Sequence, residues 1–97
     1  MTLNVQDHSP HIAIITLENQ AKRNALSRSD LRDLGELWLR LQDGPYRCII
    51  LTGAGEQSFC AGADLTGDLS AGPELSEMIH QGLLKYGVYR KPIIAAV

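Results

Sequence analysis

The sequence predicts an α/β fold in which a parallel sheet is covered by a layer of helices. Short apolar runs at residues 11–17, 46–52 and 93–97 are typical of strands. An amphipathic stretch over residues 28–42 separates the first two runs and predicts a helix. The order of strand, helix and strand favours parallel pairing, because parallel strands need a crossover connection between them.

The composition is that of one ordinary soluble domain. The 97 residues are 44% hydrophobic and 21% charged, with a net charge of −2, which excludes a disordered or membrane-embedded class. Basic residues are scattered, so no stripe for nucleic acid exists. Lys22-Arg23 and Arg90-Lys91 are the adjacent pairs, and each suffices for one or two phosphates. The charge pattern therefore does not exclude a small phosphorylated ligand.

The sequence predicts a cytoplasmic protein without a membrane partner. Residues 1–7 lack the basic and apolar regions of a signal peptide, and no apolar stretch approaches 18 residues. Cys48 lies in an apolar run and Cys60 in a glycine-rich loop. In a reducing compartment both are expected to be thiols, and a disulfide is the less favoured alternative.

The amino-terminal elements follow from local patterns. Leu3–Asp7 and His11–Leu17 flank the turn residues His8-Ser9-Pro10, which predicts a hairpin. Residues 18–26 form a polar connection that ends in small residues. Ser27 with a carboxylate three residues later has the spacing of a capping box, which announces a helix.

The first helix should run from Arg28 to Gln42. Apolar residues recur at intervals of three and four and share one face, with charges on the other: Leu31, Leu34, Leu37, Trp38 and Leu41. Gly35 in its interior costs about 0.5 to 1 kcal/mol relative to alanine. Either a neighbouring element packs closely there or the helix tolerates the cost. Gly44-Pro45 ends the helix.

The next strand, Tyr46–Thr52, is continuously apolar, which predicts cover on both faces. Residues 66–72 are small and polar, and Pro73 begins a second helix that ends before Lys91. Ile93–Val97 reads as the start of another buried strand, and no turn residue completes it. The pattern is that of an interrupted protein with an open sheet edge.

The segment Gly53–Leu65 is the one stretch whose sequence indicates a binding site. It follows a predicted strand directly, and its glycines and small residues let the backbone approach a ligand and turn its N–H groups outward. Gly53-Ala54-Gly55 is too short for a dinucleotide fingerprint, so a Rossmann module is a weak alternative. We expect such a loop to bind with main chain more than with side chains.

Side-chain chemistry is not strongly indicated. Ser58 and Cys60 lack a nucleophile elbow and an assignable histidine partner, so loop polarity and packing explain them better. The acidic residues favour capping and solvation over general acid or base work. The three histidines are far apart in sequence and no spacing resembles a zinc site, so no metal is predicted.

Four segments in order form a recognisable series. They are residues 22–26 (Lys-Arg-Asn-Ala-Leu), 48–55 (Cys-Ile-Ile-Leu-Thr-Gly-Ala-Gly), 58–65 (Ser-Phe-Cys-Ala-Gly-Ala-Asp-Leu) and 91–97 (Lys-Pro-Ile-Ile-Ala-Ala-Val). In this order and spacing they resemble the enoyl-CoA hydratase/isomerase (crotonase) family. The resemblance implies a crotonase-like spiral core of β-strands with helices packed outside. Residues 1–97 would be the amino-terminal part of one such domain, incomplete in this chain.

The resemblance also implies roles for individual residues. Ala63 would donate its backbone N–H to the thioester oxygen of an acyl-CoA, as one half of an oxyanion hole. Lys22 or Arg23 would lie near the CoA phosphates, although a solvated loop charge is an equal alternative for Arg23. The remaining positions match those that line the adenine and pantetheine path, or adjoin the oxyanion donor: Ala25, Ala61, Gly62, Asp64 and Leu65.

The resemblance implies an acyl-CoA enzyme of fatty acid metabolism, a hydratase or an isomerase, that stabilises a thioester enolate. The CoA thioester is the substrate and no cofactor is implied, while family members are commonly trimers or hexamers. In the family, the last motif continues into Asn-Gly and a glycine triplet that supplies the second oxyanion donor, and the paired glutamates of hydratases follow. The 97 residues alone are therefore expected to be inactive. The alternative is a non-catalytic crotonase-like binding or assembly module.

Overall fold

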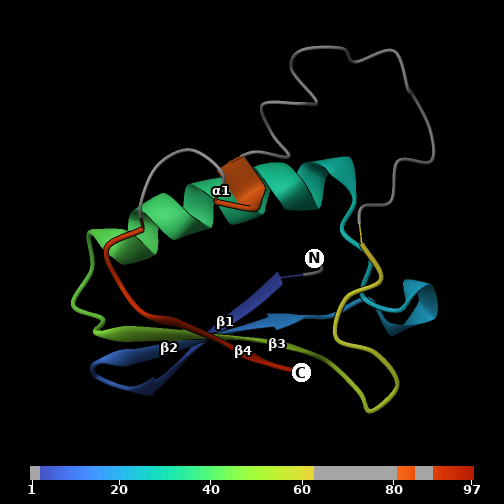
Figure 1. Ribbon diagram of the computed structural model, residues 1–97, viewed down its shortest axis with the longest axis horizontal. Helices are drawn as coiled ribbons and strands as arrows, with labels where there is room; N and C mark the ends of the chain where they lie inside the picture. The colour runs from blue at the N-terminus through green and yellow to red at the C-terminus, as the bar shows by residue number, and fades with distance from the viewer. Residues whose placement is uncertain (1–2, 63–80, 85–88) are drawn as a thin grey trace.

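The computed structural model describes residues 3–62, 81–84 and 89–97 of the chain. Its sheet has the strand order β1 (Leu3–Ser9), β2 (Ile12–Leu17), β3 (Cys48–Gly53) and β4 (Ile93–Ala96). β1 and β2 form the predicted antiparallel hairpin, whereas β2, β3 and β4 are parallel. The helix α1 (Arg28–Gln42) lies along one face of this sheet (Figure 1). The predicted α/β arrangement of sheet and helical layer is confirmed.

The core lies between α1 and the sheet. Alternate residues of β2, Ala13, Ile15 and Leu17, are buried, as expected for a strand with one face against a helix. They meet Ile49 of β3 and the buried residues of α1 in one cluster: Leu31, Leu34, Leu37, Trp38 and Leu41. The β2–β3 crossover thus brings the end of β2 and the end of β3 to the same edge of the sheet, where Leu17 pairs with Gly53.

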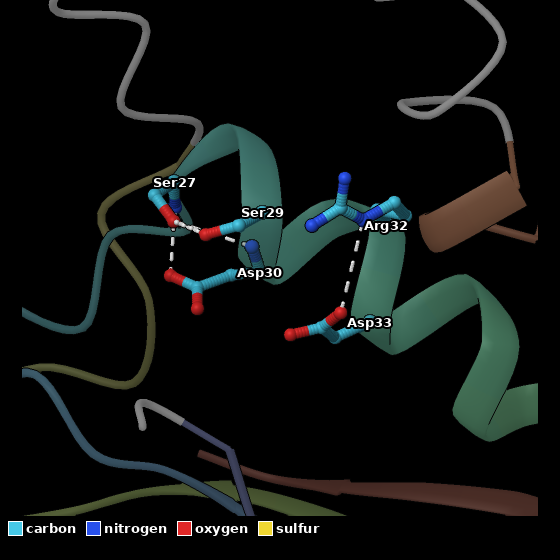
Figure 2. Close-up of polar contacts among 5 residues, drawn as sticks. All are labelled: Ser27, Ser29, Asp30, Arg32 and Asp33. Carbon is cyan, nitrogen blue, oxygen red and sulfur yellow. Dashed lines mark hydrogen bonds and ion pairs between the residues drawn. The ribbon is translucent and has the colours of Figure 1, made fainter.

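The bounds of α1 match the predicted bounds, and its first turn carries the predicted capping box. The Asp30 N–H donates to Ser27 Oγ at 3.2 Å, and the Ser27 N–H donates to Asp30 Oδ2 at 2.9 Å (Figure 2). Two N–H groups without a helical partner are satisfied in this way. In the next turn, the exposed side chains of Arg32 and Asp33 form an ion pair at 3.9 Å (Figure 2).

Gly35 marks a close crossing between α1 and the segment 81–84. A Cβ atom at Gly35 would lie 3.1 Å from the Gln81 Cβ, and one at Gly82 would lie 2.8 Å from the Leu31 carbonyl oxygen. The Trp38 indole donates to the Gly82 carbonyl at 2.8 Å across the same contact. Of the two readings of Gly35, close packing is therefore the right one. Residues 81 and 82 are helical, as predicted for the second helix, but residues 83 and 84 form a turn and residues 89 and 90 are not helical, so the predicted end just before Lys91 is wrong.

The carboxyl end of α1 is held by a lysine from the chain that leads into β4. Lys91 Nζ donates to the carbonyl oxygens of Leu41 at 2.7 Å and Gly44 at 2.9 Å. These carbonyls lie at the negative end of the helix, where a cation is favoured. The approach to β4 is thereby fixed relative to α1.

Two expectations about burial were wrong. Within β3, Ile49 is buried while its neighbours are half-buried, because α1 covers one face of the sheet in the described residues. Among the described strands, β4 is at the edge of the sheet beside β3, and its Ile94 side chain is 54% exposed. β3 also begins two residues later than predicted and ends at Gly53. The predictions for residues 66–80 lie outside the described residues.

Among the described residues, no helix has the length and apolar character needed to span a membrane.

Candidate functional site

Residues 23–26 and 60–62, which belong to two of the segments that carry the family resemblance, lie side by side. The Ala61 N–H donates to the Arg23 carbonyl at 3.0 Å, and the Leu26 N–H donates to the Gly62 carbonyl at 2.8 Å. Residues 23–26 and 60–62 therefore pair through their main chains, much as two short strands do. Of the predicted site residues, Arg23, Ala25, Ala61 and Gly62 are brought together. Ala63, Asp64 and Leu65 lie outside the described residues.

The connection begins with the short 3-10 helix η1 (Gln20–Lys22), and Arg23 follows it in the left-handed conformation with φ of 54°. Arg23 and Ala61 are exposed, and Ala25 is half-buried. Figure 1 shows η1 beside the loop that leaves β3. This exposure leaves the Arg23 side chain accessible to an anionic ligand, as the predicted phosphate role requires.

Two glycines, at the end of β3 and in the loop after it, permit this close approach. A Cβ atom at Gly53 would collide with the Phe59 carbonyl and lie 2.9 Å from the Asn24 amide nitrogen. Gly55 has φ of +80°, and a Cβ atom there would collide with the Gln20 side chain. The loop therefore folds back tightly against the connection.

Gly62 is glycine for a conformational reason. Its φ of +112° is rarely accessible to other residues, yet a Cβ atom placed there would meet nothing within 4 Å. Its N–H donates to the Cys60 sulfur at 3.4 Å. None of the described residues therefore crowds Gly62, which directly precedes Ala63, the predicted oxyanion donor, in the sequence. Both Cys48 and Cys60 are free thiols.

Asn24 is a site residue that the sequence reasoning missed. It lies in the connection, is 2% exposed and has φ of 59°. Its Nδ2 donates to the carbonyls of Ala54 at 3.0 Å and Ser58 at 2.8 Å, and its Oδ1 accepts from the Asn19 N–H at 2.9 Å. A signal was present, because asparagine is the residue other than glycine that most readily adopts the left-handed conformation.

A cavity of about 530 Å³ opens at the carboxyl ends of β3 and β4. Its size suits a small ligand, and its place beyond the ends of parallel strands is a common one for binding. None of the four predicted site residues that the structure describes lines it. Its walls are formed by residues 55–59 of the loop and by the ends of the two strands: Thr52, Gly53, Ala96 and Val97.

Groups for acid–base or metal chemistry are sparse around these residues. Within residues 3–62, 81–84 and 89–97, no three His, Cys, Asp or Glu side chains gather closely enough to hold a metal ion. The carboxylate beside the cavity is Glu56, which is exposed. What this part of the chain offers is therefore main-chain donors and a cation.

A family model for enoyl-CoA hydratase/isomerase matches residues 7–97. The (E)-benzylidenesuccinyl-CoA hydratase of Thauera aromatica is 36% identical over 92% of this chain and 36% of its own length. The mevalonyl-coenzyme A hydratase of Aspergillus fumigatus is 43% identical over 92% of this chain and 34% of its own length. The chain thus spans about a third of these relatives.

Comparison with solved structures also identifies the fold. A crystal structure of enoyl-CoA hydratase from Bacillus anthracis superposes with a TM-score of 0.85 at 31% identity. The match covers 99% of this chain and 39% of that one. The described sheet and helix are accordingly elements of the crotonase fold. The chain belongs to the enoyl-CoA hydratase/isomerase family.

Proposed function

We propose that residues 1–97 form the amino-terminal part of a single crotonase-like domain that acts on acyl-CoA thioesters as a hydratase or an isomerase. The observation that carries this proposal is the main-chain pairing of residues 23–26 with residues 60–62. It places Arg23, Ala25, Ala61 and Gly62 on two adjoining segments, and Ala63 follows Gly62 in the sequence. The names of the relatives, two hydratases of CoA thioesters, support the same substrate class.

The proposed chemistry depends on where negative charge develops. When a base removes an α proton, or water adds to the β carbon of an acyl thioester, the carbonyl oxygen becomes an enolate oxygen. A fixed N–H from Ala63 would stabilise this charge more in the transition state than in the ground state. Loss of one such donor raises the barrier by about 3 to 4 kcal/mol.

The surface around Ala63 would bind the rest of the substrate. Asp64 and Leu65 would join Ala25 and Ala61 along the adenine and pantetheine path, with Arg23 near the phosphates. An exposed cation attracts a phosphate only modestly through water, so Arg23 contributes affinity and not chemistry. The CoA thioester is the substrate, no separate cofactor is needed, and the protein acts in the cytoplasm as a trimer or hexamer.

The source gene offers the simplest test. If the proposal is right, codons for Asn-Gly and a glycine triplet follow Val97, and the complete protein turns over an enoyl-CoA. A gene without this turn would refute the enzyme reading.

The alternative, a binding or assembly module, is favoured by the position of β4 as the last strand of the sheet among the described residues, because an edge strand can pair with a strand of another chain. Calorimetry with a non-hydrolysable acyl-CoA separates the two hypotheses. Heat of binding by the complete protein without turnover of enoyl-CoA supports the module. Turnover of the enoyl-CoA whose acyl group matches that of the bound analogue supports the enzyme.

A further inference from the structure

Residues 19–24 form a small loop that is closed at its base by two hydrogen bonds between Asn19 and Asn24. The Asn24 N–H donates to the Asn19 carbonyl at 2.7 Å, and the Asn19 N–H donates to Asn24 Oδ1 at 2.9 Å. Arg23 lies inside this loop, and its N–H donates to the Gln20 carbonyl at 3.0 Å. The main-chain conformation at Arg23 therefore depends on the Asn24 side chain that helps to close the loop.

The same amide fastens the loop to the segment that follows β3. Asn24 Nδ2 donates to the carbonyls of Ala54 at 3.0 Å and Ser58 at 2.8 Å. Between these two residues in the sequence, a Cβ atom at Gly55 would collide with the Gln20 side chain, so the loop and the segment are in close contact. One buried side chain thus holds loop 19–24 against segment 54–58.

The hydrogen-bonding capacity of the Asn24 amide is fully used. Both N–H bonds of Nδ2 have a carbonyl partner, and the oxygen has an N–H partner, all between 2.8 and 3.0 Å. Glycine at this position would leave both carbonyls without this donor, and aspartate would turn a carboxylate oxygen toward two carbonyl oxygens. A carbonyl that loses its donor in a buried place is destabilising. Either substitution should therefore loosen loop 19–24 from segment 54–58.

Arg23 is the exposed residue of this held loop, next to Asn24, which is 2% exposed. The Arg23 carbonyl accepts from the Ala61 N–H at 3.0 Å, so the main chain of Arg23 is hydrogen-bonded on both sides. A cation on a fixed main chain loses less freedom when it binds a phosphate than a cation on a loose loop. The contribution of Arg23 to affinity should therefore depend on Asn24.

We propose that Asn24 is a positioning residue for coenzyme A recognition, which presents the Arg23 guanidinium to a phosphate group of the ligand by holding loop 19–24 against segment 54–58. This inference rests on the proposed function, in which Arg23 lies near the CoA phosphates. Because Asn24 is buried, it acts through Arg23 and not through a contact of its own. Loss of the amide should remove most of the affinity that Arg23 supplies.

A double-mutant cycle in the complete protein tests this dependence. Calorimetry gives the Kd for coenzyme A of the wild type, Arg23→Gln, Asn24→Gly and the double variant. Glycine keeps the left-handed backbone and removes the amide. Each single substitution should raise the Kd about two- to fivefold, the effect expected for one exposed charge. The double variant should bind no more than about 1.5-fold more weakly than Asn24→Gly alone, because the two changes remove the same contribution.

The matched control is Leu41→Ala, which truncates a buried side chain at the far end of α1 from this loop. It should lower the melting temperature while leaving both the Kd and the effect of Arg23→Gln unchanged. Asn24→Asp replaces Asn24→Gly if the latter does not fold.

Three results would overturn the positioning role. They are wild-type affinity in the Asn24 variant, single effects that simply multiply in the double variant, and failure of both Asn24 variants to fold, which would make Asn24 a residue of overall stability. Absence of coenzyme A binding by the wild-type protein would instead overturn the proposed function.

Discussion

Two adjacent residues, Arg23 and Asn24, set the path of the connection through consecutive left-handed conformations with φ of 54° and 59°. Such a conformation costs a residue other than glycine about 1 to 2 kcal/mol. The cost is offset by the main-chain bond from Ala61 to Arg23 and by the three contacts of the Asn24 amide. Strain of this kind is typical of ligand sites, and here it turns the Arg23 side chain to solvent.

Substitution of Ala63 by Trp in the complete protein should lower kcat by about 100-fold or more, because a bulky side chain would keep the thioester from the N–H donor. The melting temperature should stay close to that of the wild type. The control is Leu39→Trp, which adds a similar ring to the exposed face of α1. Steady-state kinetics with an enoyl-CoA give the comparison, and an unchanged rate for Ala63→Trp would remove this residue from the mechanism.

A tyrosine outside the site makes a prediction about pH. The Tyr46 hydroxyl donates to the Asp7 carboxylate at 2.5 Å. This bond raises the Tyr46 pKa above the ordinary tyrosine value; burial and the charge of Asp7 add to the rise, and Arg40 opposes it. Because the folded state holds this proton more tightly than the unfolded state, stability should fall as pH rises above about 10.

Tyr46→Phe should reduce the slope of unfolding free energy against pH between about pH 9 and 11, measured by denaturant titration. The slope should not vanish, because burial, and then the charge of Asp43, also raise the pKa of Tyr89. A slope identical to that of the wild type would show that the bond between Tyr46 and Asp7 does not persist in solution.

At the scale of elements, local signals were readable from sequence and long-range ones were not. The bounds of α1 and its capping box follow from spacing within one helical turn. The exposure of β4 could not be read from Ile93–Val97, because burial of an apolar strand depends on which elements pack against it. Asn24 was missed for the same reason, since its partners lie 30 and 34 residues away.

The close crossing of α1 and the segment 81–84 is testable through Gly82. Gly82→Ala should destabilise the protein by about 1 to 3 kcal/mol, because the new methyl group would meet the Leu31 carbonyl oxygen and no flexible side chain can yield. The control is Gln81→Ala, which keeps the Cβ atom at the crossing and removes exposed atoms. The measurement is thermal unfolding of both variants. A melting temperature of Gly82→Ala equal to that of Gln81→Ala would contradict the close crossing.

At the scale of the whole molecule, the described residues form one sheet and one helix that covers it. At the edge where β2 and β3 end, residues 23–26 pair with residues 60–62, and we call this pair of segments the seam. The family resemblance assigned substrate-binding roles to Arg23, Ala25, Ala61 and Gly62. These residues lie on the two paired segments, and their roles stay predictions. The resemblance did not predict the nearby cavity of about 530 Å³, whose walls come from residues 55–59 and two strand ends. Seam and cavity are thus competing places for a ligand.

Affinity for an acyl-CoA tests most directly whether the seam is the binding surface. The measurement is a calorimetric titration of the complete protein with a ketone analogue that carries a methylene group in place of the thioester sulfur. We predict saturable binding that Arg23→Gln weakens about two- to fivefold, as loss of one exposed charge should. Arg90→Gln, a matched exposed cation at the opposite end of α1, should leave the Kd unchanged. No binding by the wild type, or weakening by Arg90→Gln as large as by Arg23→Gln, would contradict the account.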